Sequence, residues 1–396
     1  MASIEKRSKN SYRLIVEAGY GNDGKRIKRS KTIKVSGIRE AEKELAKFQV
    51  EVEAGEYIAP EKMTFNKFVE EWRSKYGIKH LEAKTLENYN HLLKNHISPL
   101  FGNKRLDEIK PIHIVSFMKN LELDGARKDG KEGGLSSTTI RFVHRIMKDI
   151  LDRAVDWRIL KSNPVAATKR PKVARLTVDV YDEAEVSKLL NGLRDEAEHW
   201  RIMITLAITT GLRRGELLAL EWKHINIDEA FIEVVQSLSY VNGQNIIKVP
   251  KTKNSIRKVS IPDALLSDLI QFRNNSILSK ENASDRWAEK DHFFVFSTWD
   301  GKPYFHTVPG TWLRRFLKRK KLKPIRFHDL RHTSATLLIN QGVHAKTISS
   351  RLGHADIRTT MNTYGHALQS ADHAAGNTFN SILSSKPIQI SESNGA

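Results

Sequence analysis

The sequence contains no cysteine among its 396 residues. A disulfide scaffold and a thiolate metal site are therefore both excluded, and a reducing cytoplasm suits such a chain. Uninterrupted apolar runs are all too short to span a bilayer, and the amino terminus lacks the apolar core of a signal peptide. These absences favour a cytoplasmic protein with no membrane partner.

Acidic residues are scarce beside basic ones. The chain has 46 Asp and Glu against 66 Lys and Arg, which gives a formal net charge of +20. A charge of this size predicts a polyanionic partner, and nucleic acid is the first candidate because released counterions favour its binding. With 39% hydrophobic residues, the chain is otherwise ordinary and long enough for two or three domains with proper cores.

The amino-terminal segment, residues 1–58, is the first basic region. Alternation over Tyr12–Val16, a hairpin turn at Gly21–Gly24 and a returning strand predict a small sheet, and Arg39–Glu53 predicts a helix behind it. Such a sheet suits a DNA groove or phosphate backbone, whereas the alternative is a solvated basic hairpin. The candidate DNA-binding residues here are Arg13, Lys25, Arg26, Lys28, Arg29 and Lys31.

Residues 63–168 show helical periodicity. Apolar stripes predict one helix through Phe65 and Trp72, a second around Tyr89 and a third that starts at Leu106. Residues 125–134 are expected to form a loop, and Ser136 or Ser137 to cap a fourth helix over 139–157. A helical bundle follows from these patterns.

Linkers are predicted on both sides of the bundle. A short one at Ala59–Lys62 precedes it, and a basic one, residues 169–176, follows it. Lys169 and Arg170 are its candidate DNA-binding residues, because a tethered cationic segment gains from the field of a duplex. A solvated tether is the alternative interpretation.

The remaining chain mixes helices with short strands. Helices are predicted over 182–193, 200–209, 215–222, 262–275, 312–317 and 345–352, with Asn282–Asp291 as a surface loop. Strands are predicted over 225–227, 231–236, 246–249, 258–261 and 293–296. The polar segment Lys251–Arg257 is predicted to form a hairpin tip.

Arg213 stands where one helix stops at Thr210-Gly211 and the next begins. This position brings a guanidinium close to free backbone N–H groups, which favours an anion. Arg214 is the neighbouring alternative, and a simple ion pair between Arg213 and Glu216 is the alternative to any functional role.

Further along, His328 and Arg331 are three residues apart and share one side of a helix turn. Arg offers a planar fork of donors and His a directed N–H, which together suit a phosphate. His354 follows a helix that ends at Gly353, and Tyr364 is a possible nucleophile with which no cysteine competes. Taken singly, His354 or Tyr364 could equally be a hydrogen-bonded core residue.

These motifs together resemble the signature boxes of the tyrosine recombinases, the phage-integrase family. The first box matches Thr209–Glu216, and the second matches His328-x-x-Arg331, Leu352-Gly353-His354 and Tyr364. The resemblance implies a mostly α fold with small β elements: an amino-terminal sheet-plus-helix domain, a helical core-binding bundle and an α+β catalytic domain. The implied domains are 1–58, 63–168, the linker 169–176, 177–385 and a polar tail 386–396.

The resemblance also implies roles. Tyr364 would attack the scissile phosphate to form a 3′-phosphotyrosyl bond, Arg213 and Arg331 would clamp its oxygens, and His354 would donate to one of them. His328 would act as general base or hydrogen-bond partner. Lys251 would be the general acid at the hairpin turn, with Lys253 as the alternative.

Charge stabilisation by these side chains requires no cofactor, no metal and no ATP. The implied partners are double-stranded DNA at core-type and arm-type sites, a homotetramer on that DNA and an accessory DNA-bending or excision factor. The implied setting is the cytoplasm of a bacterial host, with the element either a phage or another integrative element. Whether Tyr364 acts within its own subunit or on a neighbour's site stays open.

Three other functions are compatible with parts of the pattern. His328 and His332 have the four-residue spacing of a zinc site on a helix, which would suit a metal-dependent nuclease. A DNA-binding regulator without catalysis and a type IB topoisomerase are the remaining alternatives. The separate basic amino-terminal segment favours an integrase.

Overall fold

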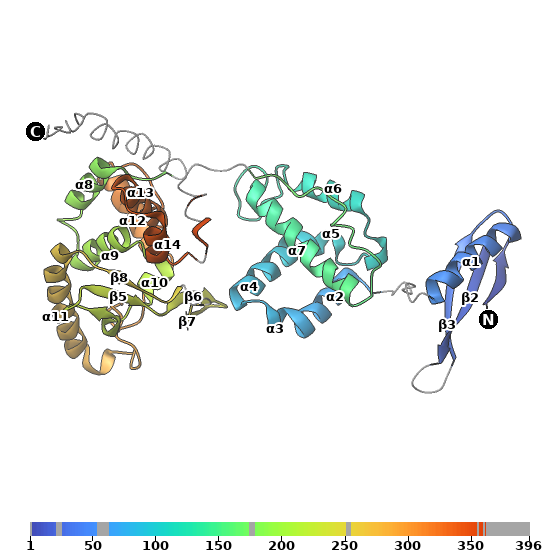
Figure 1. The fold of residues 1–396 in the computed structure, drawn as a ribbon, viewed down its shortest axis with the longest axis horizontal. Coiled ribbons are helices and arrows are strands. Elements are labelled where there is room, and N and C mark those ends of the chain that lie inside the picture. Colours follow the sequence, from blue (N-terminus) through green and yellow to red (C-terminus); the bar gives the residue numbers. More distant parts are fainter. Residues whose placement is uncertain are drawn as a thin grey trace, which may run out of the picture. The chain divides into compact units, whose positions relative to one another are not determined.

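The structure is a computed structural model that describes residues 2–20, 26–53, 63–173, 179–250, 255–354, 356–358 and 361 (Figure 1). The chain divides into two compact units, Met1–Arg175 and Leu176–Ala396. Within the first unit, the amino-terminal sheet and the helical bundle each have their own hydrophobic core. The predicted fold class, mostly helical with small β elements, is confirmed.

The amino-terminal part is a three-stranded antiparallel sheet covered by one helix. Its elements are β1 (Ala2–Ser8), β2 (Ser11–Tyr20), β3 (Arg26–Lys34) and α1 (Ile38–Glu53), with the strand order β1-β2-β3. Leu14, Val16 and Phe48 are buried between sheet and helix. Strand β1 was not predicted, because Ile4 is its only large apolar residue and cations follow it. The predicted turn at 21–24 lies outside the described residues.

The bundle that follows has an aromatic-rich core. Its helices are α2 (Phe65–Trp72), α3 (Ile78–His80), α4 (Ala83–Leu92), α5 (Ser98–Phe101), α6 (Pro111–Asn120) and α7 (Ser137–Asp156), with π-helical turns over Arg73–Gly77 and Leu93–Ile97. The Ser136 hydroxyl caps α7 by accepting from the amide of Thr139 at 3.2 Å. The predicted third helix is wrong at its start: Leu106–Glu108 is a separate 3₁₀ turn. Pro111 begins α6, where its fixed φ favours the first helical turn.

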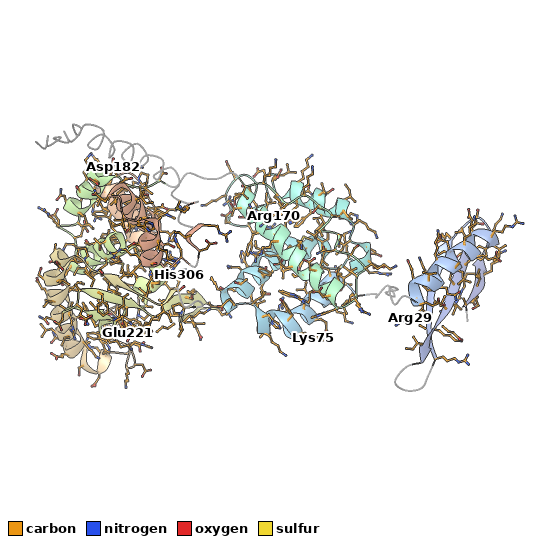
Figure 2. All side chains as sticks on the ribbon, in the orientation of Figure 1. Arg29, Lys75, Arg170, Asp182, Glu221 and His306 are labelled. Carbon is orange, nitrogen blue, oxygen red and sulfur yellow. The ribbon has the colours of Figure 1, made fainter. Side chains whose placement is uncertain are left out.

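The second unit is built from helices around small sheets. Its helices are α8 (Glu183–Gly192), α9 (Glu198–Thr210), α10 (Arg214–Leu218), α11 (Leu266–Ala283), α12 (Val308–Arg319), α13 (Asp329–Asn340) and α14 (Ala345–Leu352). Asp182, labelled in Figure 2, starts α8 by accepting from the amide of Glu185 at 2.7 Å. Helix α11 continues well beyond the predicted end at residue 275, into the expected surface loop, because its last turns are polar and still helix-compatible.

In the described part of this unit, five strands form two sheets. Strands β4 (Ile225–Asn226), β5 (Phe231–Val234) and β8 (Arg257–Ser260) pair in the order β4-β5-β8, and β6 (Ser237–Val241) pairs with β7 (Gln244–Lys248). Residues 293–296 were predicted to be a strand, which is wrong: the last three are buried, but only an isolated bridge joins Phe294 to Glu221. The run is apolar because it packs in the core, and no described strand pairs with it along its length.

Candidate active site

Helix α9 ends at the glycine that the sequence marked. Gly211 has a left-handed φ of 65°, and a Cβ at that position would lie 2.6 Å from a methyl carbon of Leu352. Both the backbone angle and the close approach of α14 therefore require glycine. The chain then turns so that Arg213 occupies the position just before α10. The predicted helix over 215–222 is shorter than expected, because α10 stops at Leu218.

Arg213 sits in a cradle of acceptors. Its Nη1 donates to Oε1 of Glu216 at 2.7 Å, and its Nη2 donates to the carbonyl oxygen of Gly353 at 3.0 Å. The ion pair with Glu216 that sequence offered as a non-functional alternative is therefore present. Nevertheless, 38% of the Arg213 side chain remains exposed, which leaves the guanidinium accessible to an anion.

Arg331 is buried beside it on the first turn of α13, with only 2% of the residue exposed. Its Nη1 donates to the carbonyl oxygen of Gly211 and its Nη2 to that of Leu352, both at 2.7 Å. These carbonyls lie at the carboxyl ends of α9 and α14, where the helix dipole favours a cation. The two guanidiniums thus meet at consecutive carbonyls, those of Leu352 and Gly353.

His354 follows this junction and is half-buried. Its backbone amide donates to the carbonyl of Ser349 at 3.0 Å, which ties His354 to the last turns of α14. Burial, followed by the charges of Arg331 and Arg213, lowers the pKa of His354 to about 4. At neutral pH the imidazole is therefore uncharged and donates from one ring nitrogen only.

His328 stands at the start of α13 and is exposed as a residue. Partial burial of its ring and the nearby Arg331 charge lower the pKa of His328. His332 lies one turn further, with its ring at 89° to that of His328 and 4.9 Å between centroids. Burial, with a contribution from His328, lowers the pKa of His332 to about 4.

The zinc-nuclease alternative needs a third ligand beside these two histidines. Asp329, the nearest carboxylate in sequence, instead binds Arg326: its Oδ1 accepts from Nη2 at 2.8 Å, and its Oδ2 accepts from the backbone amide at 2.7 Å. Across the described ranges, no group of three His, Asp or Glu residues is placed to hold a metal. The two-histidine spacing alone does not build a zinc site.

The structure brings Arg213, His328, Arg331 and His354 together: the two guanidiniums bind the carbonyls just before His354, and their charges contribute to the lowered pKa of both histidines. Lys251, its alternative Lys253 and Tyr364 lie outside the described residues. Two arginines that sequence did not single out join the cluster. Arg257 on β8 binds Glu216, and Arg351 on α14 donates to the carbonyls of Thr209 at 2.8 Å and Ser260 at 2.9 Å. Neither carries a sequence signal, because both contacts join elements distant along the chain.

The candidate DNA-binding cations of the amino-terminal sheet fall on two faces. In the β2–β3 register, Arg13 pairs with Thr32 and Glu17 with Lys28, which places Arg13 and Lys28 on the face opposite the helix. Arg29 and Lys31 pair with Val16 and Leu14 and share their side. Arg26 forms an ion pair with Glu17 at 3.4 Å, and Lys25 lies outside the described residues.

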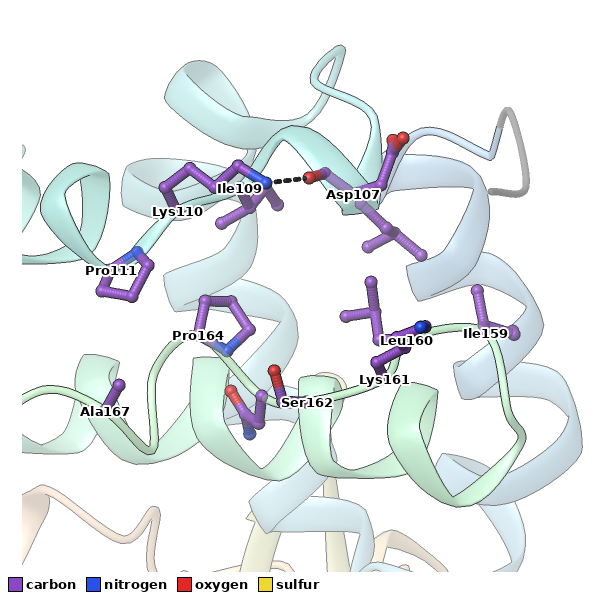
Figure 3. A pocket seen from close by; sticks show the side chains of 12 residues that line it. Asp107, Ile109, Lys110, Pro111, Ile159, Leu160, Lys161, Ser162, Pro164 and Ala167 are labelled. Carbon is purple, nitrogen blue, oxygen red and sulfur yellow. Dashed lines mark hydrogen bonds between the residues drawn. The ribbon is translucent and has the colours of Figure 1, made fainter. Parts of the chain in front are cut away.

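Hollows also occur within the described part of the bundle, apart from the predicted catalytic residues. One, of about 330 Å³, is lined by cations of α7 and by Arg170, while Lys169 is exposed beside it. Another, of about 350 Å³, is mainly apolar and has Lys110 donating to the Asp107 carbonyl at its rim (Figure 3). No described helix in either unit is both long and apolar enough to cross a membrane.

Comparisons with known proteins decide the family. The profile of the phage integrase family matches residues 179–370. The ICEBs1 integrase of Bacillus subtilis is 32% identical over 280 residues, which cover 71% of this chain and 73% of that protein. The chain belongs to the phage integrase family. This integrase is accordingly a tyrosine-type site-specific recombinase, an enzyme of DNA integration and recombination with DNA as its partner.

Other relatives extend the similarity of the integrase to nearly the whole chain. A XerC-like tyrosine recombinase of Caldanaerobacter subterraneus is 27% identical and covers 96% of this chain and 98% of its own length. The profile of the SAM-like amino-terminal domain of phage integrases matches residues 64–121. Among solved structures, the Tn1549 transposon integrase has a TM-score of 0.65 at 20% identity, covering 80% of this chain and all of that one. The lambda integrase dimer on a core site has a TM-score of 0.56 at 17% identity, covering 91% and 93%. Both show the shared fold.

Proposed function

We propose that this recombinase integrates or excises a mobile element by cutting DNA strands with Tyr364 and rejoining them. The observation that carries the proposal is the meeting of Arg213 and Arg331 at the Leu352–Gly353 junction, directly before His354. Two guanidiniums and a neutral imidazole form a preorganised set of donors and charge for one phosphate.

The proposed reaction exchanges one phosphate ester for another. The Tyr364 oxygen bonds to phosphorus, the bond to the 5′ oxygen breaks, and a 3′-phosphotyrosyl link remains. His328, whose pKa is lowered and which is therefore mostly neutral at pH 7, accepts or relays the phenol proton. Lys251, or Lys253, protonates the departing oxygen. The ester energy is conserved, so rejoining requires no ATP.

Arg213 and Arg331 offset the charge that grows on the nonbridging oxygens, while His354 donates a hydrogen bond to one of them. A site that supplies this positive charge through side chains has no chemical need for a divalent cation. The roles of Tyr364 and the lysine rest on the sequence motif alone.

The DNA partner is proposed to contact three regions. The bundle at 63–168 and the catalytic domain at 177–385 each contact core-type sites, and the basic linker 169–176 joins these two domains in the sequence. The domain at 1–58 binds arm-type sites through the sheet face that carries Arg13 and Lys28. We further propose a homotetramer on DNA, assisted by a DNA-bending or excision factor, in a bacterial cytoplasm; a lambda integrase tetramer with the same fold, at a TM-score of 0.54, is bound to a Holliday junction.

An assay of recombination between two sites tests this function. The substrates are circular and linear DNAs that carry the ends of the host element and its chromosomal target. We expect joined products in EDTA without ATP, which separates a recombinase from a metal-dependent nuclease. Relaxation of supercoils without joining would instead indicate a topoisomerase, and binding without cleavage would indicate a regulator.

A further inference from the structure

Arg213, Glu216 and Arg257 form a triad of charges, of which Glu216 and Arg257 are buried. Glu216 accepts from Arg213 Nη1 at 2.7 Å, and it also accepts from Arg257: Nη2 to Oε2 at 2.9 Å and Nη1 to Oε1 at 3.2 Å. Only 6% of the Arg257 side chain and 4% of the Glu216 side chain are exposed. The carboxylate is therefore held by two guanidiniums, and the two-point contact is with Arg257.

Arg257 is fixed by three separate elements. Besides its contact with Glu216 on α10, its Nε donates to the carbonyl of Arg351 on α14 at 2.7 Å. The residue itself begins β8. The fit is tight, because a Cβ added at Gly353 would lie 2.8 Å from Arg257 Nη1. A side chain anchored in this way keeps its guanidinium in place while the neighbouring site binds DNA.

The charge balance of the triad depends on Arg257. Paired with Glu216 alone, Arg213 would have its charge cancelled, and its guanidinium would be held by the carboxylate. With two guanidiniums and one carboxylate, a single positive charge is left over, and Arg213 is the exposed member. A scissile phosphate then competes with Glu216 for Arg213, and Glu216 is a weaker competitor because Arg257 already neutralises it.

We propose that Arg257 is a positioning residue that neutralises Glu216 and so keeps Arg213 available to the scissile phosphate. It acts through Glu216 and does not touch the DNA. The inference rests on the proposed function, because it assumes that Arg213 clamps the phosphate during cleavage.

The test measures single-turnover formation of covalent protein–DNA complex, together with the dissociation constant for DNA, on the full chain. The variants are Arg257→Met, Arg257→Lys, Glu216→Gln and the double variant R257M/E216Q. Each is assayed on a nicked duplex with either an ordinary scissile phosphate or a methylphosphonate, which lacks one negative charge. The double variant leaves no uncompensated charge in the core, so it retains the fold if the single variant does not.

We expect Arg257→Met to slow cleavage by about tenfold or more while DNA affinity stays within about threefold, because Arg213 is then held by Glu216. The cleavage rate of Arg257→Lys should lie between those of the wild type and Arg257→Met. Adding E216Q should restore most of the rate, so that R257M/E216Q cleaves about as fast as Glu216→Gln alone. On methylphosphonate, the difference between wild type and Arg257→Met should shrink.

Three results would overturn the proposal: an unchanged rate in Arg257→Met, an equal defect on both linkages, or R257M/E216Q slower than Glu216→Gln alone. If Arg257→Met or Glu216→Gln does not fold, R257M/E216Q is compared with the wild type instead, and a loss of cleavage of more than about tenfold would overturn the proposal. Absence of covalent complex with the wild-type protein would instead refute the proposed function. Normal wild-type cleavage with any of the three results refutes only the role of Arg257.

Discussion

Arg213 and Arg331 donate to neighbouring carbonyl oxygens, those of Gly353 and Leu352, although one arginine directly precedes α10 and the other lies on α13. The end of α14 thus sets the spacing of both guanidiniums and of His354, which follows directly. Any change that moves this junction should disturb all three groups at once.

The forked geometry of Arg213 should be essential for cleavage. Arg213→Lys keeps the charge but loses the two-point contact, so we expect the single-turnover cleavage rate to fall by roughly 100-fold. Arg214→Lys is the matched control, because Arg214 is the exposed neighbour and should change the rate little. An equal loss in both variants would show that the assignment of Arg213 is wrong.

Gly353 should be required for more than its backbone angle. Gly353→Ala would place a carbon 2.8 Å from the guanidinium of Arg257, in addition to the strain of a left-handed φ of 66°. Gly342→Ala is the control, since Gly342 has a φ of +75° and open space around it. Both should lose about 1 kcal/mol of stability from strain, measured by chemical denaturation. Only Gly353→Ala should also slow cleavage strongly; equal rates would contradict the crowding argument.

The site histidines predict an acid-sensitive fold. Burial lowers the pKa of His332 and of His354 from an ordinary value of 6.5 to about 4. Between these values the unfolded chain binds protons that the folded chain does not, so stability should fall as the pH drops from about 6.5 towards 4. Thermal unfolding at pH 7, 6 and 5 measures this slope. His332→Asn should flatten it, and an unchanged slope would show that His332 does not titrate with unfolding.

The two faces of the amino-terminal sheet should differ in DNA binding. Replacing Arg13 and Lys28 by Ala removes cations from the face opposite the helix, so affinity for duplex DNA should fall and the dependence of affinity on salt should weaken. Replacing Arg29 and Lys31 by Ala removes the same charge from the helix side and serves as the control. Electrophoretic mobility shifts at several salt concentrations provide the measurement. Equal effects would mean that charge alone matters, not the face.

The helix ends at the site were predictable because glycine has few substitutes there. Gly211 and Gly353 both adopt left-handed angles, and α14 ends at Leu352 as predicted. The hydrogen bonds from Arg213 and Arg331 to carbonyls at the ends of other helices were not predictable, since they depend on how α9, α13 and α14 pack. Arg257 was missed for the same reason: nothing within a strand indicates that its side chain meets α10.

The local sequence pattern also failed to predict strands correctly where a buried apolar run has no strand partner, or where a strand depends on its partner. The apolar run at Phe294–Phe296 is buried without forming a strand, whereas β6, which has buried Leu238 and Val241, forms a strand because β7 pairs with it. The motif residues were identified because they are rare side chains at fixed spacing. Their catalytic roles remain predictions.

The most direct test is to trap the protein on a nicked duplex whose short cleaved fragment diffuses away, and to map the attached residue by mass spectrometry. We predict a covalent link between the 3′ phosphate and Tyr364, formed equally well in EDTA and lost in Tyr364→Phe, which should still bind DNA. A covalent adduct that persists in Tyr364→Phe, attachment through a 5′ phosphate, or a requirement for a divalent cation would contradict the account.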